Sequence, residues 1–234
     1  MKKLLLFDID GTLLRAQDAT RHAMNEAFRE LFFTDKSIED FKDLTFFGWT
    51  DLALFEGAAF KLIGRPLAKK EYDAFIKIYA EHLQNHLQTC NFYLMPGIAE
   101  LLPRLASRED VILGLETGNI EPAAYLKLKR GRIDGFFRCG GFGSDSADRA
   151  ELIQAGIDRA NRLNHDLISK ENIYVIGDAP HDITAGNKLG VNTIAVGTGL
   201  GDQAQVMAAN PTVYFQDLAD IQALLNFLEL NRES

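Results

Sequence analysis

The sequence predicts an α/β fold in which a doubly wound, mostly parallel sheet carries a small inserted helical domain. Two observations predict it. Short apolar or β-branched segments alternate with amphipathic helical patterns along most of the 234 residues, as in parallel sheets covered by helices on both faces. One long region near the start lacks such segments and shows only helical periodicity.

The expected strands are short apolar runs that end near Gly, Asp, Thr or Ser. They are KLLLFDID at 3–10, VILGLETG at 111–118, FFRCGGFG at 136–143, IYVIGD at 173–178, NTIAVGTG at 192–199 and TVYFQ at 212–216. Their nearly continuous apolar character indicates strands buried on both faces.

The region from 16 to 94 shows no good strand, only helical patterns. In its segments RHAMNEAFRELF at 21–32, DLALFEGAAFKLI at 51–63 and EYDAFIKIYAEHLQNHL at 71–87, apolar residues recur at spacings of three and four. LMPGIAELLPRL, in which Pro96 opens a helix, then marks the return to the sheet. We therefore expect a core domain of residues 1–15 and 95–234 and a helical cap domain of residues 16–94.

Composition excludes several functional classes. The formal net charge is −8 and no dense Lys/Arg stripe is present, which argues against nucleic-acid binding. The apolar runs are far shorter than the roughly 18 residues of a membrane span, and Asp8 interrupts the signal-like start. Cys90 and Cys139 form no CxxC pair and are expected to be reduced thiols of a cytoplasmic protein.

Acidic side chains follow two of the expected strands. Asp8 and Asp10 follow the first, and Asp178 and Asp182 follow the fourth. The carboxyl ends of parallel strands lie at one edge of a sheet, so we expect these acids to converge. Two carboxylates about 4 Å apart repel by roughly 4 kcal/mol at an effective dielectric of 20, so the group needs a cation. Oxygen ligands favour Mg²⁺, which would also let a phosphate approach.

Three motifs make the sequence similar to a known family. DIDGT at 8–12, TGN at 117–119 and GDAPHD at 177–182 resemble the signatures of the haloacid dehalogenase-like hydrolase superfamily. The helical insert after the first motif resembles its phosphoglycolate-phosphatase-type branch, and the resemblance covers essentially the whole chain. It implies a Mg²⁺-dependent hydrolase with a phosphorylated substrate.

The resemblance implies roles for the residues after the first strand. Asp8 would be the nucleophile that forms an aspartyl-phosphate. Asp10 would protonate the leaving alcohol and then activate water, while its backbone carbonyl binds the metal. Gly11 would allow a sharp turn beside the ligand. The acid at position 10 also favours phosphoryl transfer over dehalogenation, because dehalogenases lack an acid there.

The other motifs receive roles in the same way. Thr117 would bind a phosphoryl oxygen through its hydroxyl, and the amides of Gly118 and Asn119 would face the anion. Asp178 would bind the metal. Asp182 would hold metal-bound water or support the site from behind.

The cation that bridges nucleophile and phosphate is the point at which the sequence departs from the family. The family usually carries a lysine after the third strand, often before a proline, whereas this chain has SDSADRAELI. We nominate Arg149, whose planar guanidinium can do the same electrostatic work. Lys127 is the alternative, and a solvated Arg149 is the simpler reading of that residue alone.

The stretch FFGWTD at 46–51 resembles a cap segment that faces the active site in the family. The resemblance implies substrate contacts by Trp49, Thr50 or Asp51. Alternatively, Trp49 belongs to the core of the cap and Thr50 or Asp51 caps the next helix.

Three histidines are open to a similar choice. His82 and His86, four residues apart, could bind a metal, but the sequence offers no third ligand nearby, which favours a solvated helix face. His181 is expected to be an exposed loop residue.

The sequence thus predicts a Mg²⁺-dependent phosphatase that hydrolyses a small phosphomonoester, such as phosphoglycolate or a sugar phosphate. Its partner would be this small metabolite, with no nucleic acid or membrane, and its state monomeric or homodimeric. A phosphomutase on the same site and a non-catalytic binding module are the alternatives.

Overall fold

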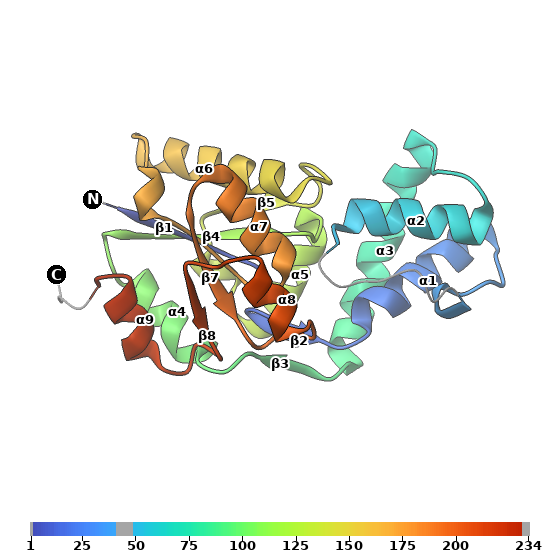
Figure 1. Cartoon of the computed structure of the whole chain (residues 1–234). Coiled ribbons are helices and arrows are strands. Elements are labelled where there is room, and N and C mark those ends of the chain that lie inside the picture. Colours follow the sequence, from blue (N-terminus) through green and yellow to red (C-terminus); the bar gives the residue numbers. More distant parts are fainter. Residues whose placement is uncertain (1, 41–48, 231–234) are drawn as a thin grey trace.

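The core of the protein is a six-stranded parallel sheet with the order β5-β4-β1-β6-β7-β8. A computed structural model describes residues 2–40 and 49–230 (Figure 1). The strands are β1 (Lys3–Phe7), β4 (Val111–Thr117), β5 (Cys139–Phe142), β6 (Ile173–Gly177), β7 (Asn192–Val196) and β8 (Val213–Phe215). All six strands predicted from the sequence are confirmed, and so is the fold class.

Alternate residues of β1 serve the two faces of the sheet, as strand geometry requires. Leu4 and Leu6 belong to the apolar cluster with α6 and α7, whereas Leu5 and Phe7 belong to the cluster with α4, α5 and α9. Helices therefore cover both faces (Figure 1). The core helices are α4 (Ile98–Ala106), α5 (Glu121–Gly131), α6 (Arg149–Asn164), α7 (Pro180–Leu189), α8 (Gln203–Ala208) and α9 (Ile221–Phe227), with 3₁₀ turns at Asp134–Phe136 and Lys170–Asn172.

The position of β1 in the sheet places the functional site. β1 lies between β4 and β6, with β4 and β5 on one side of it and β6, β7 and β8 on the other. In sheets of this kind the crevice beyond the carboxyl ends of the strands, where the order switches, is the usual binding site. The residues that follow β1, β4 and β6 therefore meet there.

The helical insert consists of α1 (Ala19–Phe32), α2 (Asp51–Ile63) and α3 (Lys69–Thr89), with a 3₁₀ turn at Ile38–Asp40. It projects from one end of the sheet and forms a cap (Figure 1). Aromatic rings join the three helices: the ring centroid of Phe75 lies 4.6 Å from that of Phe28 and 5.0 Å from that of Phe55. Contacts of this kind add stability beyond the area they bury.

Two short strands correct the expectation that residues 16–94 contain only helix. β2 (Leu14–Ala16) and β3 (Phe92–Leu94) pair antiparallel where the chain leaves the core and returns, with Leu14 opposite Leu94 and Ala16 opposite Phe92. Three residues are too few to show a period of two, and the partner strand lies beyond the whole insert. The domain boundaries at 15/16 and 94/95 stay a prediction.

Two further observations concern the cysteines and the possibility of a membrane span. Cys90 and Cys139 are free thiols, the first partly buried and the second buried. Within the described ranges 2–40 and 49–230, no helix combines the length and the apolar character that crossing a membrane requires.

Candidate active site

Three buried carboxylates meet at the carboxyl ends of β1 and β6. Asp8 directly follows β1, Asp178 directly follows β6, and Asp182 lies in the first turn of α7. One oxygen from each lies within 4.8 Å of the others. Such an all-oxygen set fits a hard divalent cation, and Mg²⁺ is the common choice for it.

Burial makes this group of acids costly without a cation. Desolvation raises the pKa of Asp8 to about 7, although Arg149 opposes the shift. Desolvation, followed by the charge of Asp8, also raises the pKa of Asp178 well above its usual range, while the Thr12 hydroxyl donates a 3.0 Å hydrogen bond to it. Gly11 has φ +99°, and a Cβ there would lie 2.6 Å from Asp178 Oδ2, so glycine permits the close approach.

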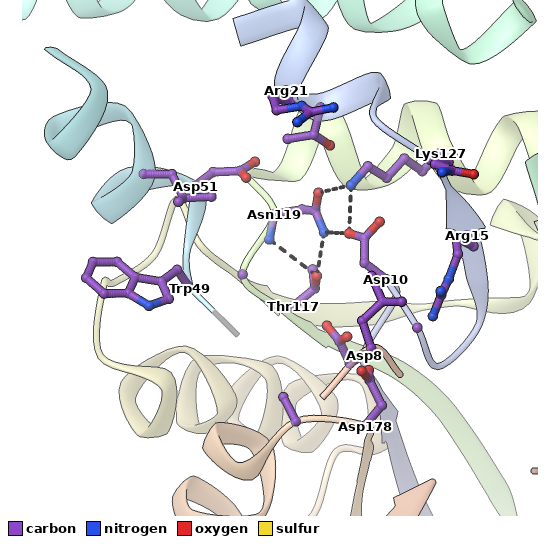
Figure 2. Close-up of a pocket in the computed structure, with 18 of the residues that line it drawn as sticks. Asp8, Asp10, Arg15, Arg21, Trp49, Asp51, Thr117, Asn119, Lys127 and Asp178 are labelled. Atoms are coloured by element: carbon purple, nitrogen blue, oxygen red, sulfur yellow. Dashed lines mark hydrogen bonds and ion pairs between the residues drawn. The ribbon is translucent and has the colours of Figure 1, made fainter. Parts of the chain in front are cut away.

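The Asp10 carboxylate lies apart from the three-acid group. Its Oδ2 accepts hydrogen bonds from Lys127 Nζ at 2.6 Å and Asn119 Nδ2 at 2.7 Å (Figure 2). Asn119 Oδ1 in turn accepts from Lys127 Nζ at 2.7 Å. The structure thus brings together three of the four acids that were expected on one rim, and holds the fourth in a separate network at the same crevice.

Arg149 is the basic residue that reaches Asp8. It is the first residue of α6, with its side chain only 10% exposed, and its Nη2 lies 3.1 Å from Asp8 Oδ1. The same nitrogen contacts Asp182, and Nε lies 3.0 Å from Glu116 Oε2. Desolvation lowers its pKa, but the surrounding acids outweigh this effect and raise it, so the guanidinium stays charged. Lys127, the alternative, contacts Asp10 instead.

Sequence reasoning missed Glu116. This residue lies inside β4, is fully buried, and makes an ion pair with Arg149. Desolvation raises its pKa well above the usual range, with Arg149 opposing. A charged residue within the apolar run VILGLETG was the signal that could have found it, because a buried acid requires a partner.

The loop after β4 links the sheet to the Asp10 network. The buried Thr117 hydroxyl accepts hydrogen bonds from the Asn119 backbone N–H at 3.3 Å and from Asn119 Nδ2 at 2.9 Å. A Cβ on Gly118 would lie 2.5 Å from the Trp49 carbonyl oxygen. Glycine at this position therefore lets the cap approach the core.

The cap docks on the same loop through Asp51. The Asp51 backbone N–H donates to the Gly118 carbonyl at 2.7 Å, and the Ile120 N–H donates to Asp51 Oδ2 at 2.9 Å. Burial raises the pKa of Asp51 to about 6, with Lys127 opposing. This reciprocal pair closes the cap over the acids.

The neighbouring cap residues agree with parts of both readings of this segment, and the substrate contacts themselves stay a prediction. Thr50 caps α2, since its hydroxyl accepts from the Ala53 N–H at 3.4 Å. Trp49 is 51% exposed and so does not belong to the core of the cap. Residues 46–48 of the quoted stretch lie outside the described residues.

A cavity of about 500 Å³ lies between the core and the cap. Asp8, Asp10 and Asp178 form its floor, and Trp49 and Arg21 line it from the cap side (Figure 2). This volume suits a small molecule. His181 is exposed, as expected, but it lies in the first turn of α7 rather than in a loop, and it is not among the lining residues.

Comparisons with known proteins agree with this architecture. The chain matches the model of the haloacid dehalogenase-like hydrolases over residues 5–196. It is 26% identical over 221 residues to Pyrophosphatase PpaX of Listeria monocytogenes, covering 94% of this chain and 95% of that protein. It is 25% identical over 240 residues to a 5'-nucleotidase of Pseudomonas aeruginosa, covering 94% of each.

The fold comparison gives the same result. The crystal structure of a predicted phosphoglycolate phosphatase from Haemophilus somnus superposes with a TM-score of 0.70 at 21% identity, covering 95% of this chain and 97% of the other. The match to the family model, over most of the chain, includes all three buried acids. This protein therefore belongs to the haloacid dehalogenase-like hydrolase family.

Proposed function

We propose that this hydrolase is a Mg²⁺-dependent phosphatase that cleaves a small phosphomonoester through a phosphoryl group carried on Asp8. One observation supports this above all. The buried Asp8 carboxylate lies beside the other two acids on one side and 3.1 Å from the Arg149 guanidinium on another. A carboxylate placed between a metal site and a fixed cation is suited to attack an electrophilic, negatively charged phosphorus.

The residues that would hold the metal are Asp8, Asp178, Asp182 and the backbone carbonyl of Asp10. When bound, Mg²⁺ offsets the charge of the acids and attracts the phosphoryl oxygens. Every other contribution comes from the side chains and amides around it.

In the first step an Asp8 oxygen attacks phosphorus, and the bond between phosphorus and the leaving oxygen breaks. Asp10 donates a proton to that oxygen. In the second step Asp10 takes a proton from water, whose oxygen attacks the phosphorus; the bond between phosphorus and the Asp8 oxygen breaks, and phosphate is released. Lys127 and Asn119, both hydrogen-bonded to Asp10 Oδ2, hold the carboxyl group in place for both transfers.

The phosphoryl group itself would be held by neutral and cationic donors. The Thr117 hydroxyl and the amides of Gly118 and Asn119 lie at the start of the loop into α5, where backbone donors favour anions. Arg149 balances the charge that develops on the phosphoryl oxygens.

The size of the substrate follows from the cavity and its cover. A space of about 500 Å³ closed by the cap accommodates a metabolite, and a folded phosphoprotein would be too large for it. Phosphoglycolate and sugar phosphates are the classes we propose, with Trp49 and Asp51, which line the cavity, providing contacts from the cap. The buried Thr50 caps α2 instead. A cytoplasmic location and a monomeric or dimeric state stay predictions.

The test is a screen of phosphomonoesters with Mg²⁺, beginning with an activated aryl phosphate. We expect turnover by the wild type and by Asp73→Asn, which changes an exposed acid of α3. Asp8→Asn should lower kcat by at least about a thousandfold with an unchanged circular dichroism spectrum. Near-wild-type turnover by Asp8→Asn would refute the mechanism, and isomerisation of a sugar 1-phosphate to the 6-phosphate would replace the phosphatase with a mutase.

A further inference from the structure

A row of histidine and glutamate side chains joins two helices of the cap, away from the cavity. α1 contributes His22, Glu26 and Glu30 at intervals of four residues, and α3 contributes His82 and His86 at the same interval. Residues four apart lie on the same face of a helix. The sequence alone supplied no third ligand for the two histidines of α3, whereas the fold places α1 against them.

The contacts in this row alternate between the helices. Glu26 Oε2 lies 2.9 Å from His82 Nδ1 and 3.0 Å from His86 Nε2. His82 Nε2 lies 2.9 Å from Glu30 Oε2. The ring centroid of His22 lies 5.4 Å from that of His86. Each member of the row therefore contacts a neighbour on the opposite helix.

His82 faces a carboxylate with each of its ring nitrogens. A neutral imidazole has one N–H and can donate one hydrogen bond only. The second nitrogen directs a lone pair at carboxylate oxygen unless a cation lies between them. A proton or a metal ion can supply that charge, and both use the same atoms.

We propose that this row binds one Zn²⁺ ion through His82 Nδ1, His86, Glu26 and His22. Imidazole nitrogens with a carboxylate oxygen are a common zinc ligand set, whereas Mg²⁺ prefers oxygen ligands alone. Glu30 would not touch the ion. It would accept the remaining N–H of His82, the contact that fixes the tautomer and orientation of a ligating histidine.

In the structure the donor atoms of the row lie too far apart to hold an ion, since among the described residues only Asp8, Asp178 and Asp182 place one ligand atom each within 4.8 Å of the others. Zinc binding would therefore require the side chains of the row to move. The nitrogens of His82 and His86 now lie at hydrogen-bond distance from Glu26, and zinc bonds of about 2.0–2.2 Å require both rings to close on one point. The side chains of the two histidines are 23% and 24% exposed and that of Glu26 is 43% exposed, so these side chains lie partly at the surface of the cap. The bound ion would join α1 to α3.

The site is tested by binding rather than by turnover. Chelator-treated protein in excess Mg²⁺, which occupies the acids of the active site, is titrated with Zn²⁺ against a chromogenic chelator. We expect one equivalent to bind with a micromolar or tighter Kd. Co²⁺ in place of Zn²⁺ should give the visible absorption bands of a nitrogen-ligated, four-coordinate ion.

The variants separate this site from other metal-binding groups. His82→Ala and His86→Ala should each weaken Zn²⁺ binding by more than about tenfold, and Glu30→Gln should weaken it by about tenfold while retaining the stoichiometry. His165→Asn, at the far end of α6, should bind as the wild type does. Thermal melts without metal show that each variant folds. Absence of Zn²⁺ binding, or binding that survives both histidine changes, would overturn the proposal, and so would loss of binding in Asp178→Asn alone.

Discussion

Arg149 serves three buried carboxylates with a single guanidinium. Its Nη2 faces Asp8 and Asp182, while its Nε faces Glu116. A planar guanidinium offers donors in several fixed directions, which a lysine ammonium on one flexible stem does not. Glu116 contacts Nε, and Nη2 therefore stays available for Asp8 and Asp182. In this way Glu116 helps to fix the position of the Arg149 side chain.

Removing the arginine should affect stability and activity separately. Arg149→Gln leaves the acids without their cation, so we expect the free energy of unfolding to fall by about 3–5 kcal/mol and kcat by at least about a hundredfold. Adding Glu116→Gln should restore part of the stability and none of the activity. Urea unfolding and phosphatase assays measure the two effects.

A second arginine on the same helix provides the control. Arg159 pairs with Asp145 at the surface, and its side chain is 35% exposed. Arg159→Gln should cost about 1 kcal/mol or less and leave kcat unchanged. If Arg149→Gln behaved like Arg159→Gln, the central place given to Arg149 would be wrong.

The residues that could be predicted are those at strand ends. Asp8 and Asp178 stand out because an acid stops an apolar run. Glu116 does not, because it lies within the run and its partner comes from a distant helix. The position of the Asp10 carboxylate was equally beyond the sequence, since it depends on Lys127 and Asn119 reaching it from α5 and its loop.

At the scale of elements, the start of α2 acts as the docking point of the cap. Asp51 exchanges hydrogen bonds with the loop after β4, and its carboxylate is buried by the contact. The docked state therefore binds a proton at Asp51 more tightly than the unfolded chain does, because the pKa rises from 3.8 to about 6. The ionised form carries a penalty that grows as pH rises between these values.

The raised pKa of Asp51 predicts that the free energy of unfolding depends on pH. Asp51→Asn keeps an oxygen for the Ile120 N–H and cannot ionise, so it escapes the penalty. Relative to the wild type, its free energy of unfolding should improve by about 2 kcal/mol between about pH 4.5 and pH 7.5. Chemical unfolding of both proteins at the two pH values measures it. A difference that is constant with pH would show that Asp51 is not held in this buried contact.

Long helices were predicted from the sequence, whereas short strands whose partner lies far away in the chain were not. The helix expected at 51–63 appears as α2, and the one expected at 71–87 lies within α3. β2 and β3 escaped because each has three residues and pairs across the entire insert. A strand that exists through one distant partner leaves almost no periodic trace in its own sequence.

At the scale of the whole molecule, the three-acid group proposed to bind Mg²⁺ is assembled only in the folded state. Asp8 and Asp178 come from strands far apart in the chain, and pairing of β1 with β6 brings them together. An ion that binds the folded state alone stabilises it by about 2.7 kcal/mol at a hundred times its Kd. For a chain of this size we expect Tm to rise by about 5–11 °C.

Thermal unfolding with Mg²⁺ and with a chelator measures this shift. Asp178→Asn should lose most of it, whereas Asp217→Asn, at a partly exposed acid of the core outside the three-acid group, should retain it. An equal Tm in both solutions for the wild type would argue against metal binding at the three acids. Zinc is excluded from these solutions, so the Zn²⁺ binding proposed for the cap does not contribute to the shift in Tm.

The paired strands β2 and β3 have a practical consequence. Because Ala16 lies directly opposite Phe92, the two points at which the insert joins the core are neighbours. A tight two-residue turn could bridge them, and an unrelated insert with adjacent ends could replace the native one. The insert could therefore be exchanged as a unit. New substrate selectivities could be engineered by grafting other inserts at this point without changing the acids that form the floor of the cavity.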